Sequence, residues 1–252
     1  MTDPLIKMVN INKTFDGVVA LNDVNFEIGH NEIIGLIGDN GAGKSTLIKV
    51  LMGVHRPNKG MIYFKGKKME NWSVEIARRS GIEPVYQERA LVDKQCLWKN
   101  IFMGREITHN LGFLKVQESR EKTENLMRKL MGFTSKSITP ESIVKNMSGG
   151  EKQGVAIARA LYFQAELIIL DEPTTALSIS ETRKVLNFIK MIKEEGKSAV
   201  VISHTIYQIY PVVDRFVIMD RGRIVGEFKK EEVSMDELIG KLHMVADTGH
   251  IS

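Results

Sequence analysis

A glycine-rich segment, Gly38 to Thr46 ("GDNGAGKST"), has the residue types and spacing of a phosphate-binding loop. It fits the pattern G-x-x-x-x-G-K-[ST], with an apolar strand expected before it and a helix after it. Glycines let backbone N–H groups converge on oxyanions, and the N-terminus of the helix adds positive potential. We expect Lys44 to reach the β- and γ-phosphates of a nucleotide and Ser45 to ligate Mg²⁺. The residues predicted to bind the nucleotide in this loop are Gly38, Asp39, Asn40, Gly41, Ala42, Gly43, Lys44, Ser45 and Thr46.

Two carboxylates follow a second apolar strand. The stretch "LIILDEP" brings Asp171 and Glu172 to a carboxyl-terminal strand end, where parallel sheets bind their ligands. We expect Asp171 to hold the metal through water and Glu172 to orient and polarise the attacking water. An Asp-Glu-Pro turn alone is more often a solvated strand end, and the pairing with the phosphate loop favours the catalytic interpretation.

His204 ends another apolar strand, "AVVISH". A lone histidine there is usually structural, but this one is expected at the same sheet edge as the two sites above and could contact the γ-phosphate. Gln87, in "PVYQER", follows a short extended stretch and carries no signal by itself.

A second glycine-rich loop, "MSGGE", precedes a helix that is expected to continue through Leu161. Ser148 and Glu151 form an S-x-x-E capping box, so this loop is also a helix N-terminus that can meet an anion. We expect an inserted helical lobe to carry it well away from the phosphate loop of its own chain. The anion should therefore belong to another molecule.

Composition limits what these motifs can belong to. The 252 residues are 43% hydrophobic, which suffices for one large domain or one domain with an inserted lobe. The net charge of +4 permits an acidic partner without demanding one. A single cysteine, Cys96, excludes an internal disulfide and predicts an intracellular compartment with an inert thiol. No signal-peptide pattern or apolar run of roughly 18 to 20 residues is visible, so the sequence predicts a protein that is soluble or held at a membrane by a partner.

Strands and helices alternate along most of the chain. Residues 5–12, 24–34 and 61–66 are predicted to be antiparallel strands, whereas "EIIGLIG", "ELIILDEP" and "SAVVISH" are predicted to be buried strands of a largely parallel sheet. A hairpin is expected to turn at Asp220 to Gly222. We predict a nucleotide-binding core in 1–87 and 163–235, a helical subdomain in 88–162, and a polar, peripheral tail in 236–252.

Taken together, the motifs resemble those of the ATPase subunits of ATP-binding cassette (ABC) transporters, over nearly all of residues 5–235. "GDNGAGKST" matches the Walker A loop, "MSGGE" the signature loop and "LIILDE" the Walker B strand. Further matches, in the order of the family, are Gln87 to the Q-loop, "TTALS" to the D-loop and His204 to the switch histidine. Phe15 matches the aromatic residue that stacks on adenine.

The resemblance implies a RecA-like P-loop NTPase core with an N-terminal antiparallel β subdomain and an inserted α-helical subdomain. It implies ATP as substrate, Mg²⁺ held by Ser45, Gln87 and Asp171, and catalysis by Glu172, His204 and Gln87. Two copies would dimerise head to tail, and each would cover the ATP of the other. The residues implied to bind that ATP in trans are Ser148, Gly149, Gly150 and Glu151.

The same resemblance implies binding partners and a cellular location. Transmembrane permease subunits would dock near Gln87 and the helical lobe, a solute-binding protein would act indirectly, and the chain would sit peripherally on the cytoplasmic face of the membrane. "NIFMGRE" and the segment 202–227 look like the ATPases of simple-sugar importers for ribose or xylose. The fold alone does not identify the solute.

Two residues depart from the family pattern. Glu151 replaces the usual Gln, and its carboxylate would repel a γ-phosphate of the partner unless it reaches back to the Ser148 N–H. Ser178 stands where the D-loop usually has Asp, which puts the cross-dimer contact of that loop in doubt. Ser178 and Glu181 form a second capping box, so Ser178 is also expected to start a helix.

Several other functions are open at this point. A soluble ABC-type ATPase acting on nucleic acid or ribosomes is disfavoured because the chain has no basic stripe with interleaved aromatics, so no nucleic-acid partner is expected. A non-hydrolysing regulatory module is disfavoured by the joint presence of Lys44, Asp171, Glu172 and His204. A P-loop kinase would have no use for "MSGGE", and an exporter cassette remains an alternative to an importer.

Overall fold

The computed structural model describes residues 3–85, 91–130 and 138–249. Within this part of the chain, the larger sheet has six strands in the order β10-β9-β3-β8-β7-β6. These strands are β3 (Ile33–Ile37), β6 (Ile82–Val85), β7 (Leu167–Asp171), β8 (Ser198–Ile202), β9 (Arg215–Asp220) and β10 (Arg223–Lys229). Strands β6, β7, β8, β3 and β9 run parallel, and β10 returns antiparallel to β9. The predicted largely parallel core is confirmed.

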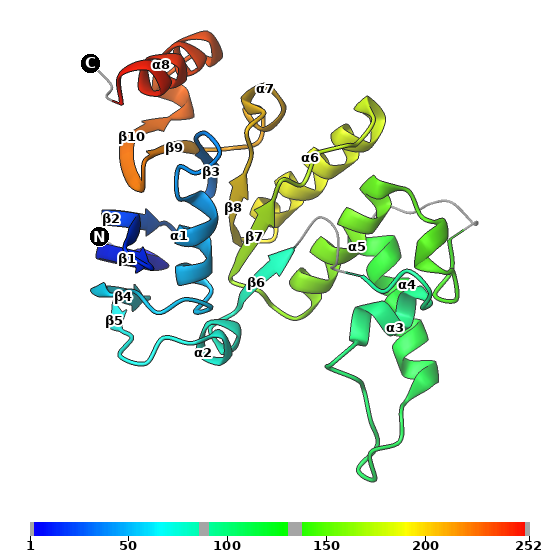
Figure 1. Ribbon diagram of the computed structural model, residues 1–252. Coiled ribbons are helices and arrows are strands. Elements are labelled where there is room, and N and C mark those ends of the chain that lie inside the picture. The colour runs from blue at the N-terminus through cyan, green and yellow to red at the C-terminus, as the bar shows by residue number, and fades with distance from the viewer. Residues whose placement is uncertain (1–2, 86–90, 131–137, 250–252) are drawn as a thin grey trace.

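A smaller antiparallel sheet contains the N-terminal strands, in the order β2-β1-β4-β5. The strands are β1 (Ile6–Phe15), β2 (Val18–Ile28), β4 (Lys59–Phe64) and β5 (Lys67–Lys68). A tight turn with positive φ at Asp16 and Gly17 joins β1 to β2. Figure 1 shows this sheet and α1 (Lys44–Leu51) on one side of the larger sheet.

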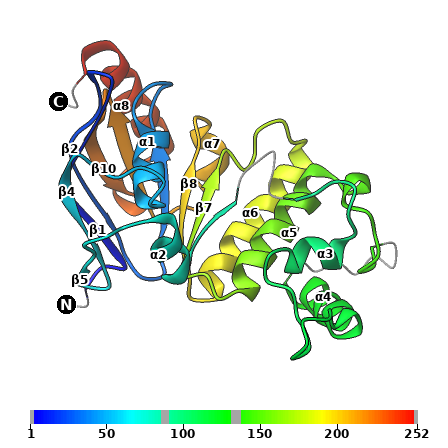
Figure 2. The ribbon, with the colours of Figure 1, turned by 60° about the horizontal axis from the view of Figure 1, so that its bottom comes forward.

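The remaining helices cover the opposite face of the larger sheet or lie at its edges. Between β6 and β7 the described residues form α3 (Leu97–Phe102), α4 (Val116–Leu130), the 3-10 turn Val144–Asn146 and α5 (Gly149–Tyr162). α5 packs on β6 beside α6, and α3 and α4 lie further from the sheet (Figure 2). The other helical elements are α2 (Val74–Arg79), α6 (Ile179–Glu194), α7 (Ile206–Ile209), the 3-10 turn Lys230–Glu232 and α8 (Met235–Thr248).

Two hydrophobic cores lie on the two faces of the larger sheet, and alternation along β3 links them. Ile33 and Ile37 join the core shared with α3 to α8, whereas Ile34 and Leu36 join the core shared with α1 and the antiparallel sheet. All four side chains are fully buried. Because both faces are covered, β3 is apolar along its whole length, as a parallel strand requires.

One predicted strand, 24–34, is divided in the structure. β2 ends at Ile28 and β3 begins at Ile33. Asn31 between them has φ of 53°, and the Gly29 N–H donates to Glu32 Oε2 at 2.6 Å. This local turn redirects the chain from the antiparallel sheet into the parallel one, and the single-strand prediction is wrong here.

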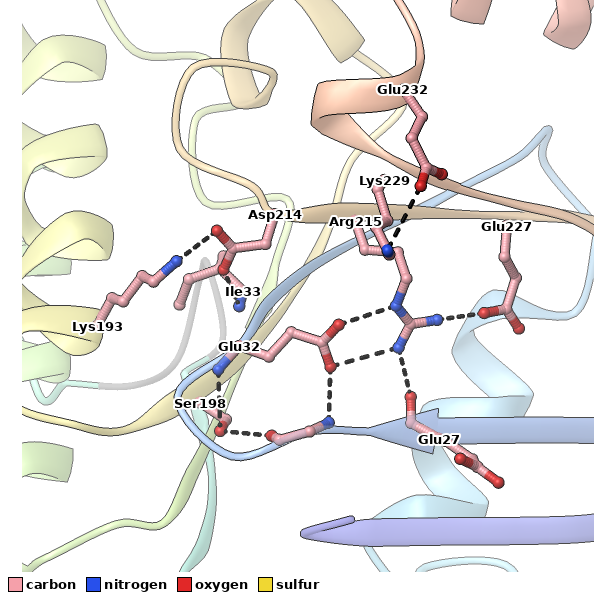
Figure 3. A network of polar contacts seen from close by, with 11 residues as sticks. Glu27, Glu32, Ile33, Lys193, Ser198, Asp214, Arg215, Glu227, Lys229 and Glu232 are labelled. Carbon is pink, nitrogen blue, oxygen red and sulfur yellow. Dashed lines mark hydrogen bonds and ion pairs between the residues drawn. The ribbon is translucent and has the colours of Figure 1, made fainter. Parts of the chain in front are cut away.

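A polar network fixes this crossing between the sheets at the amino ends of β3, β8 and β9 (Figure 3). Arg215 donates to Glu32 Oε1 at 2.8 Å and to the Glu27 carbonyl oxygen at 2.7 Å, and it forms an ion pair with Glu227. Ser198 Oγ donates to the Gly29 carbonyl oxygen at 2.9 Å. One guanidinium therefore joins β2, β9 and β10 to the start of β3, at the end of the sheet opposite the phosphate loop.

The C-terminal segment 235–248 differs from the polar, peripheral tail that was expected. It forms α8, which begins at a capping box of Ser234 and Glu237 and packs on β9 and α7. Leu238 and Val245, seven residues apart, are buried in the core on that face of the sheet. Met235, Leu238, Ile239, Leu242 and Val245 recur at spacings of three and four residues, so one side of the helix is apolar. The expectation of a polar tail overlooked this pattern, and it is wrong here. None of the described helices is long and apolar enough to cross a membrane.

Candidate functional site

The phosphate loop connects β3 to α1 in a conformation that depends on glycine. Gly38, Gly41 and Gly43 have φ values of 147°, 84° and 102°, which residues with a Cβ rarely adopt. A Cβ on Gly38 would also lie 2.2 Å from the Met219 carbonyl oxygen. The curvature of the loop is therefore set by backbone conformation and by close packing against β9.

The N-terminus of α1 has no side-chain cap. Its N-cap residue is Gly43, and its first turn contains no acidic residue. The unpaired N–H groups of this turn and the helix dipole together give a site for an anion. Ser45, the second residue of the helix, is exposed at this end.

Lys44 is folded back onto its own loop. Its Nζ donates to the carbonyl oxygens of Gly38 at 2.6 Å and Asp39 at 2.9 Å. Burial lowers the pKa of Lys44, while the negative charges of Glu172, Asp39 and Asp171 act in the opposite direction. An ammonium that is buried among acceptors and has left bulk water is suited to exchange carbonyl oxygens for phosphate oxygens.

Asp171 and Glu172 lie at the carboxyl end of β7, near this ammonium. Burial raises the pKa of Asp171, the charge of Glu172 raises it further, and Lys44 opposes both. Glu172 has φ of 49°, and its N–H donates to the Ile202 carbonyl oxygen of the neighbouring strand at 3.0 Å. The chain thus leaves the sheet sharply at Glu172 and remains tied to β8.

The carboxylate of Glu172 is held by two side chains. Its Oε1 lies 2.8 Å from Nδ1 of His204, and its Oε2 accepts from Thr175 Oγ1 at 3.1 Å. The His204 side chain is 62% exposed, whereas that of Glu172 is 25% exposed. A fixed carboxylate beside an accessible imidazole can orient a water molecule and meet an anionic substrate from the solvent side.

The donor set suits Mg²⁺ held mainly by water and phosphate oxygens. Among the described residues, no group of three or more His, Cys, Asp or Glu side chains could hold a metal ion by itself. Mg²⁺ usually keeps several waters and takes only one or two protein ligands beside a nucleotide. Ser45 and Asp171 provide a hydroxyl and a carboxylate of that kind. The third predicted ligand, Gln87, lies outside the described residues.

Phe15 lies at the end of β1 with its side chain exposed. Its ring meets the His55 ring edge to face at 4.9 Å, and Lys13 Nζ lies 4.8 Å from its centroid. The turn at Asp16 and Gly17 holds the ring at the surface, where a base could stack on it.

The second glycine-rich loop caps α5 in the predicted way. The Ser148 N–H donates to Glu151 Oε2 at 2.9 Å, and the Glu151 N–H donates to Ser148 Oγ at 3.3 Å. Glu151 Oε1 lies 3.9 Å from Lys184 Nζ. The carboxylate therefore points back into its own helix cap, as the expected capping box requires, and its charge is partly offset.

This loop is packed on the start of α6. A Cβ on Gly149 would lie 2.5 Å from Leu177 Cδ2, and one on Gly150 would lie 3.1 Å from Glu181 Cβ. Ser178 and Glu181 form the second predicted capping box. Residues 148–151 and 177–181 thus form one surface, in which neither glycine could carry a side chain without displacing a neighbour.

The structure brings Lys44, Asp171, Glu172 and His204 together at the carboxyl edge of the larger sheet. The second glycine-rich loop, 148–151, does not join them within the same chain. The helix that follows it, α5, packs in the core on one face of the larger sheet, whereas α1 packs in the core on the other face (Figures 1 and 2). The two loops therefore begin helices on opposite sides of the sheet.

One contact was not predicted from the sequence. The turn between β9 and β10 supports the phosphate loop, because the Gly222 N–H donates to the Ala42 carbonyl oxygen at 2.9 Å. A Cβ on Gly222 would lie 2.7 Å from the Ala20 carbonyl oxygen. The turn itself is predictable from the sequence, but the phosphate loop that it contacts lies far away along the chain.

Comparisons with a family model and with individual proteins both indicate the same protein family. The model of the family described as "ABC transporter" matches residues 21–175. The chain is 41% identical to the xylose/arabinose import ATP-binding protein XylG of Sulfolobus acidocaldarius, covering 93% of this chain and 92% of that one. It is 34% identical to the ribose import ATP-binding protein RbsA of Caldanaerobacter subterraneus, covering 94% of this chain but only 47% of the relative. The chain thus spans about half the length of the ribose-type relative.

Solved structures agree on the fold. CbiO1 of Clostridium perfringens, part of the ABC transporter complex cbiONQ, superposes with a TM-score of 0.79 at 26% identity, covering 96% of this chain and 95% of that one. The ADP conformation of the ATP-binding cassette MJ1267 gives a TM-score of 0.78 at 24% identity, with 96% of each chain covered.

Proposed function

The chain belongs to the ABC transporter family, and from this premise we propose that it binds Mg²⁺-ATP between two copies of itself and uses hydrolysis to power the import of a sugar. The ABC-type ATPase activity follows from the family. The metal, the particular sugar, the membrane partners and the role of each residue are the proposed parts.

The observation that carries the proposal is the grouping of four side chains at one sheet edge. Lys44 lies in the electrostatic field of Asp171 and Glu172, and Glu172 contacts His204. Lys44 is the first residue of α1, after the loop that follows β3, and the other three lie at or just beyond the carboxyl ends of β7 and β8. A lysine suited to phosphate, a carboxylate suited to a metal ion (Asp171) and a second carboxylate held by hydrogen bonds (Glu172) rarely occur together at one sheet edge by chance.

Each residue has a proposed role in hydrolysis. Lys44 leaves the Gly38 and Asp39 carbonyl oxygens and pairs with the β- and γ-phosphates. Glu172, held by His204 and Thr175, accepts a hydrogen bond from the attacking water and orients it in line with the γ-phosphate.

The metal and the base have proposed contacts of their own. Ser45, and Asp171 through water, would hold Mg²⁺, which would neutralise charge on the phosphates. Gln87 is a further proposed ligand, and Phe15 stacks on the adenine.

The second loop completes the site from another copy. In the proposed head-to-tail dimer, Ser148, Gly149 and Gly150 of one chain cover the γ-phosphate held by the phosphate loop of the other. The two glycines let this loop pack closely on Leu177 and Glu181 at the start of α6. In the proposed dimer the N–H groups of the first turn of α5 face the anion. The inward-turned Glu151 carboxylate reduces the repulsion that a free acidic side chain would produce.

The sugar is proposed from the relatives. The similar proteins include a xylose/arabinose import ATP-binding protein and a ribose import ATP-binding protein. We propose a pentose as the solute, delivered by a solute-binding protein to transmembrane permease subunits. The chain would be held peripherally at the cytoplasmic face of the membrane by those subunits.

A groove beside β6 is the proposed docking surface for the permease. A cavity of about 290 Å³ lies between α2, β6 and α5, and its lining includes Val74, Glu83, Arg105 and Arg159. Burial lowers the pKa of Arg159, and the charges of Arg105 and Arg78 lower it further against that of Glu83. A mixed apolar and cationic groove suits a short permease segment with an acidic residue.

Val74→Glu tests this docking surface. Val74 is 45% exposed in the groove, so the variant should fold and bind ATP normally but lose co-purification with the permease subunits. Met61→Glu is the matched control, because Met61 is 38% exposed on the antiparallel sheet outside the groove. Retained co-purification of Val74→Glu would overturn the proposed docking site.

Transport tests the function as a whole. Cells in which Glu172→Gln replaces the natural chain should lose uptake of labelled xylose, arabinose or ribose, while uptake of an unrelated amino acid should be unchanged. Normal uptake of all three pentoses would contradict the proposed sugar.

A further inference from the structure

An exposed isoleucine begins α6. Ile179 is 86% exposed, whereas Val185, Ile189 and Ile192 of the same helix are fully buried. It follows the cap residue Ser178 directly. One exposed aliphatic side chain is ordinary on a protein surface, and the position of Ile179 beside the second glycine-rich loop is what gives it meaning.

A matching cavity lies elsewhere along the same sheet edge. It has a volume of about 360 Å³ and lies between the phosphate loop, the segment after His204, and α8. Its apolar lining is provided by Ile37, Ile206, Ile239, Leu242 and Ala246. The cavity can accept a branched aliphatic side chain, and Asp39, His204 and His243 also line it with polar groups.

Ile179 and this cavity are connected through the carboxyl edge of the sheet. Glu172 contacts His204, which lines the cavity, and the chain from Glu172 leads directly to Ser178 and Ile179. α8 packs on β9 and α7, and Figures 1 and 2 show it apart from the start of α6. The isoleucine of one chain is therefore not positioned to fill its own cavity.

The side chain that fills the cavity is inferred from the proposed dimer, on which this inference rests, because Ile179 and the cavity each lie next to one of its two glycine-rich loops. Ile179 belongs to the surface formed by residues 148–151 and 177–181, and Gly38 and Asp39 of the phosphate loop line the cavity. If the signature loop of one chain covers the phosphate loop of the other, these two adjacencies would bring its Ile179 to the rim of that chain's cavity. Two-fold symmetry makes the contact reciprocal.

We propose that, in the ATP-bound dimer, Ile179 of each chain inserts into the cavity between the phosphate loop and α8 of the other chain. Through this contact, α8 becomes part of the dimer interface. It also supplies an apolar cross-dimer contact next to Ser178, where the family pattern has Asp.

Cysteine cross-linking tests the contact directly. The variant Ile179→Cys/Ala246→Cys is made on a Cys96→Ser, Glu172→Gln background, so that the introduced pair contains the only thiols. Ala246 is exposed and lines the cavity, so its replacement should leave the core intact. Mild oxidation with Mg²⁺-ATP should give a covalent dimer, and oxidation without ATP or with either single cysteine should give much less.

Sedimentation of the same sample separates the possible failures. A dimer that forms with ATP but does not cross-link would overturn the Ile179 contact and leave the proposed ATP sandwich standing. A protein that binds ATP and remains a monomer would overturn both. A covalent dimer that forms equally from Ile179→Cys alone would place the two isoleucines against each other and would also overturn the proposal.

A charge substitution provides a second, independent test. Ile179→Asp should weaken ATP-dependent dimerisation at least about 100-fold, because two buried aliphatic side chains are lost per dimer. Leu111→Asp is the matched control, since Leu111 is 85% exposed on the helical lobe and should leave dimerisation unchanged. Equal effects of the two variants would overturn the proposal.

Discussion

The two glycine-rich loops differ in how the helix that follows each of them is capped. α1 begins at Gly43, without a side-chain cap or an acidic residue in its first turn. α5 begins at Ser148, with a complete capping box and Glu151 in its first turn. The first helix leaves its positive N-terminus available and places Lys44 beside it, whereas the second satisfies part of its N-terminus internally. This difference favours the first loop as the main phosphate anchor and the second as a cover supplied by another copy.

The largest effect is expected at neither loop but at the carboxylate of Glu172. Glu172→Gln should reduce phosphate release by about 100-fold or more, because a general base or water-positioning group contributes that much. ATP affinity, measured by equilibrium titration, should remain close to that of the wild type. Glu151→Gln makes the same chemical change in the second loop and should alter hydrolysis only a few-fold. Near-normal turnover of Glu172→Gln would remove it from the proposed mechanism.

Ser148→Arg tests whether the second loop acts in trans. The bulky cation should block the surface that covers the partner's phosphate, with a loss of steady-state hydrolysis of about 100-fold, comparable to the removal of one transition-state donor. ATP binding to the single chain should be retained. Weakened binding to the monomer would instead indicate a role in the chain's own site.

Mixing variants sharpens this comparison. A dimer of Lys44→Ala with Ser148→Arg has one composite site with both lesions and one with neither. The mixture should therefore regain hydrolysis that each variant lacks alone, as measured by phosphate release. A mixture no more active than its components would contradict a site shared between chains.

Lys44→Ala tests the first loop. Loss of charge-assisted hydrogen bonds to phosphate should weaken ATP binding by about 10- to 100-fold, measured by equilibrium titration. Lys49→Ala is the control, because Lys49 is an exposed cation of the same helix. If Lys44→Ala bound ATP with wild-type affinity, the proposed contact between Lys44 and the phosphates would be contradicted.

The smallest effect is expected from the charge on the second loop. Glu151→Gln removes a carboxylate near the proposed γ-phosphate while an amide oxygen can still accept from the Ser148 N–H. Dimerisation with ATP should strengthen only about two- to five-fold, since a partly solvated charge interaction is worth at most about 1 kcal/mol. Glu124→Gln is the control, because it neutralises an exposed carboxylate of α4 outside the surface formed by residues 148–151 and 177–181. A weaker dimer for Glu151→Gln alone would show that its charge assists closure.

Local chemistry made much of this molecule predictable from its sequence. The capping boxes at Ser148 and Ser178 depend on residues three apart, and both are present. The hairpin at Asp220 to Gly222 and the parallel core were likewise visible in turn chemistry and apolar runs.

Features that depend on tertiary contacts were not predictable in the same way. The direction in which the turn at Asn31 sends the chain, from one sheet into the other, depends on contacts with distant strands. α8 is a different case, because its apolar spacing was present in the sequence and was overlooked. The support of the phosphate loop by Gly222 joins residues far apart in the sequence. Gln87 lies outside the described residues, and its proposed role remains a prediction.

The most direct test of the account is the mass in solution of Glu172→Gln, measured by sedimentation at high protein concentration with and without Mg²⁺-ATP. We expect a monomer without nucleotide and a dimer with it, because each ATP joins the phosphate loop of one chain to the signature loop of the other. A mass that ATP does not change, in a sample shown to bind ATP, would contradict the proposal that the two loops share the nucleotide in the isolated protein.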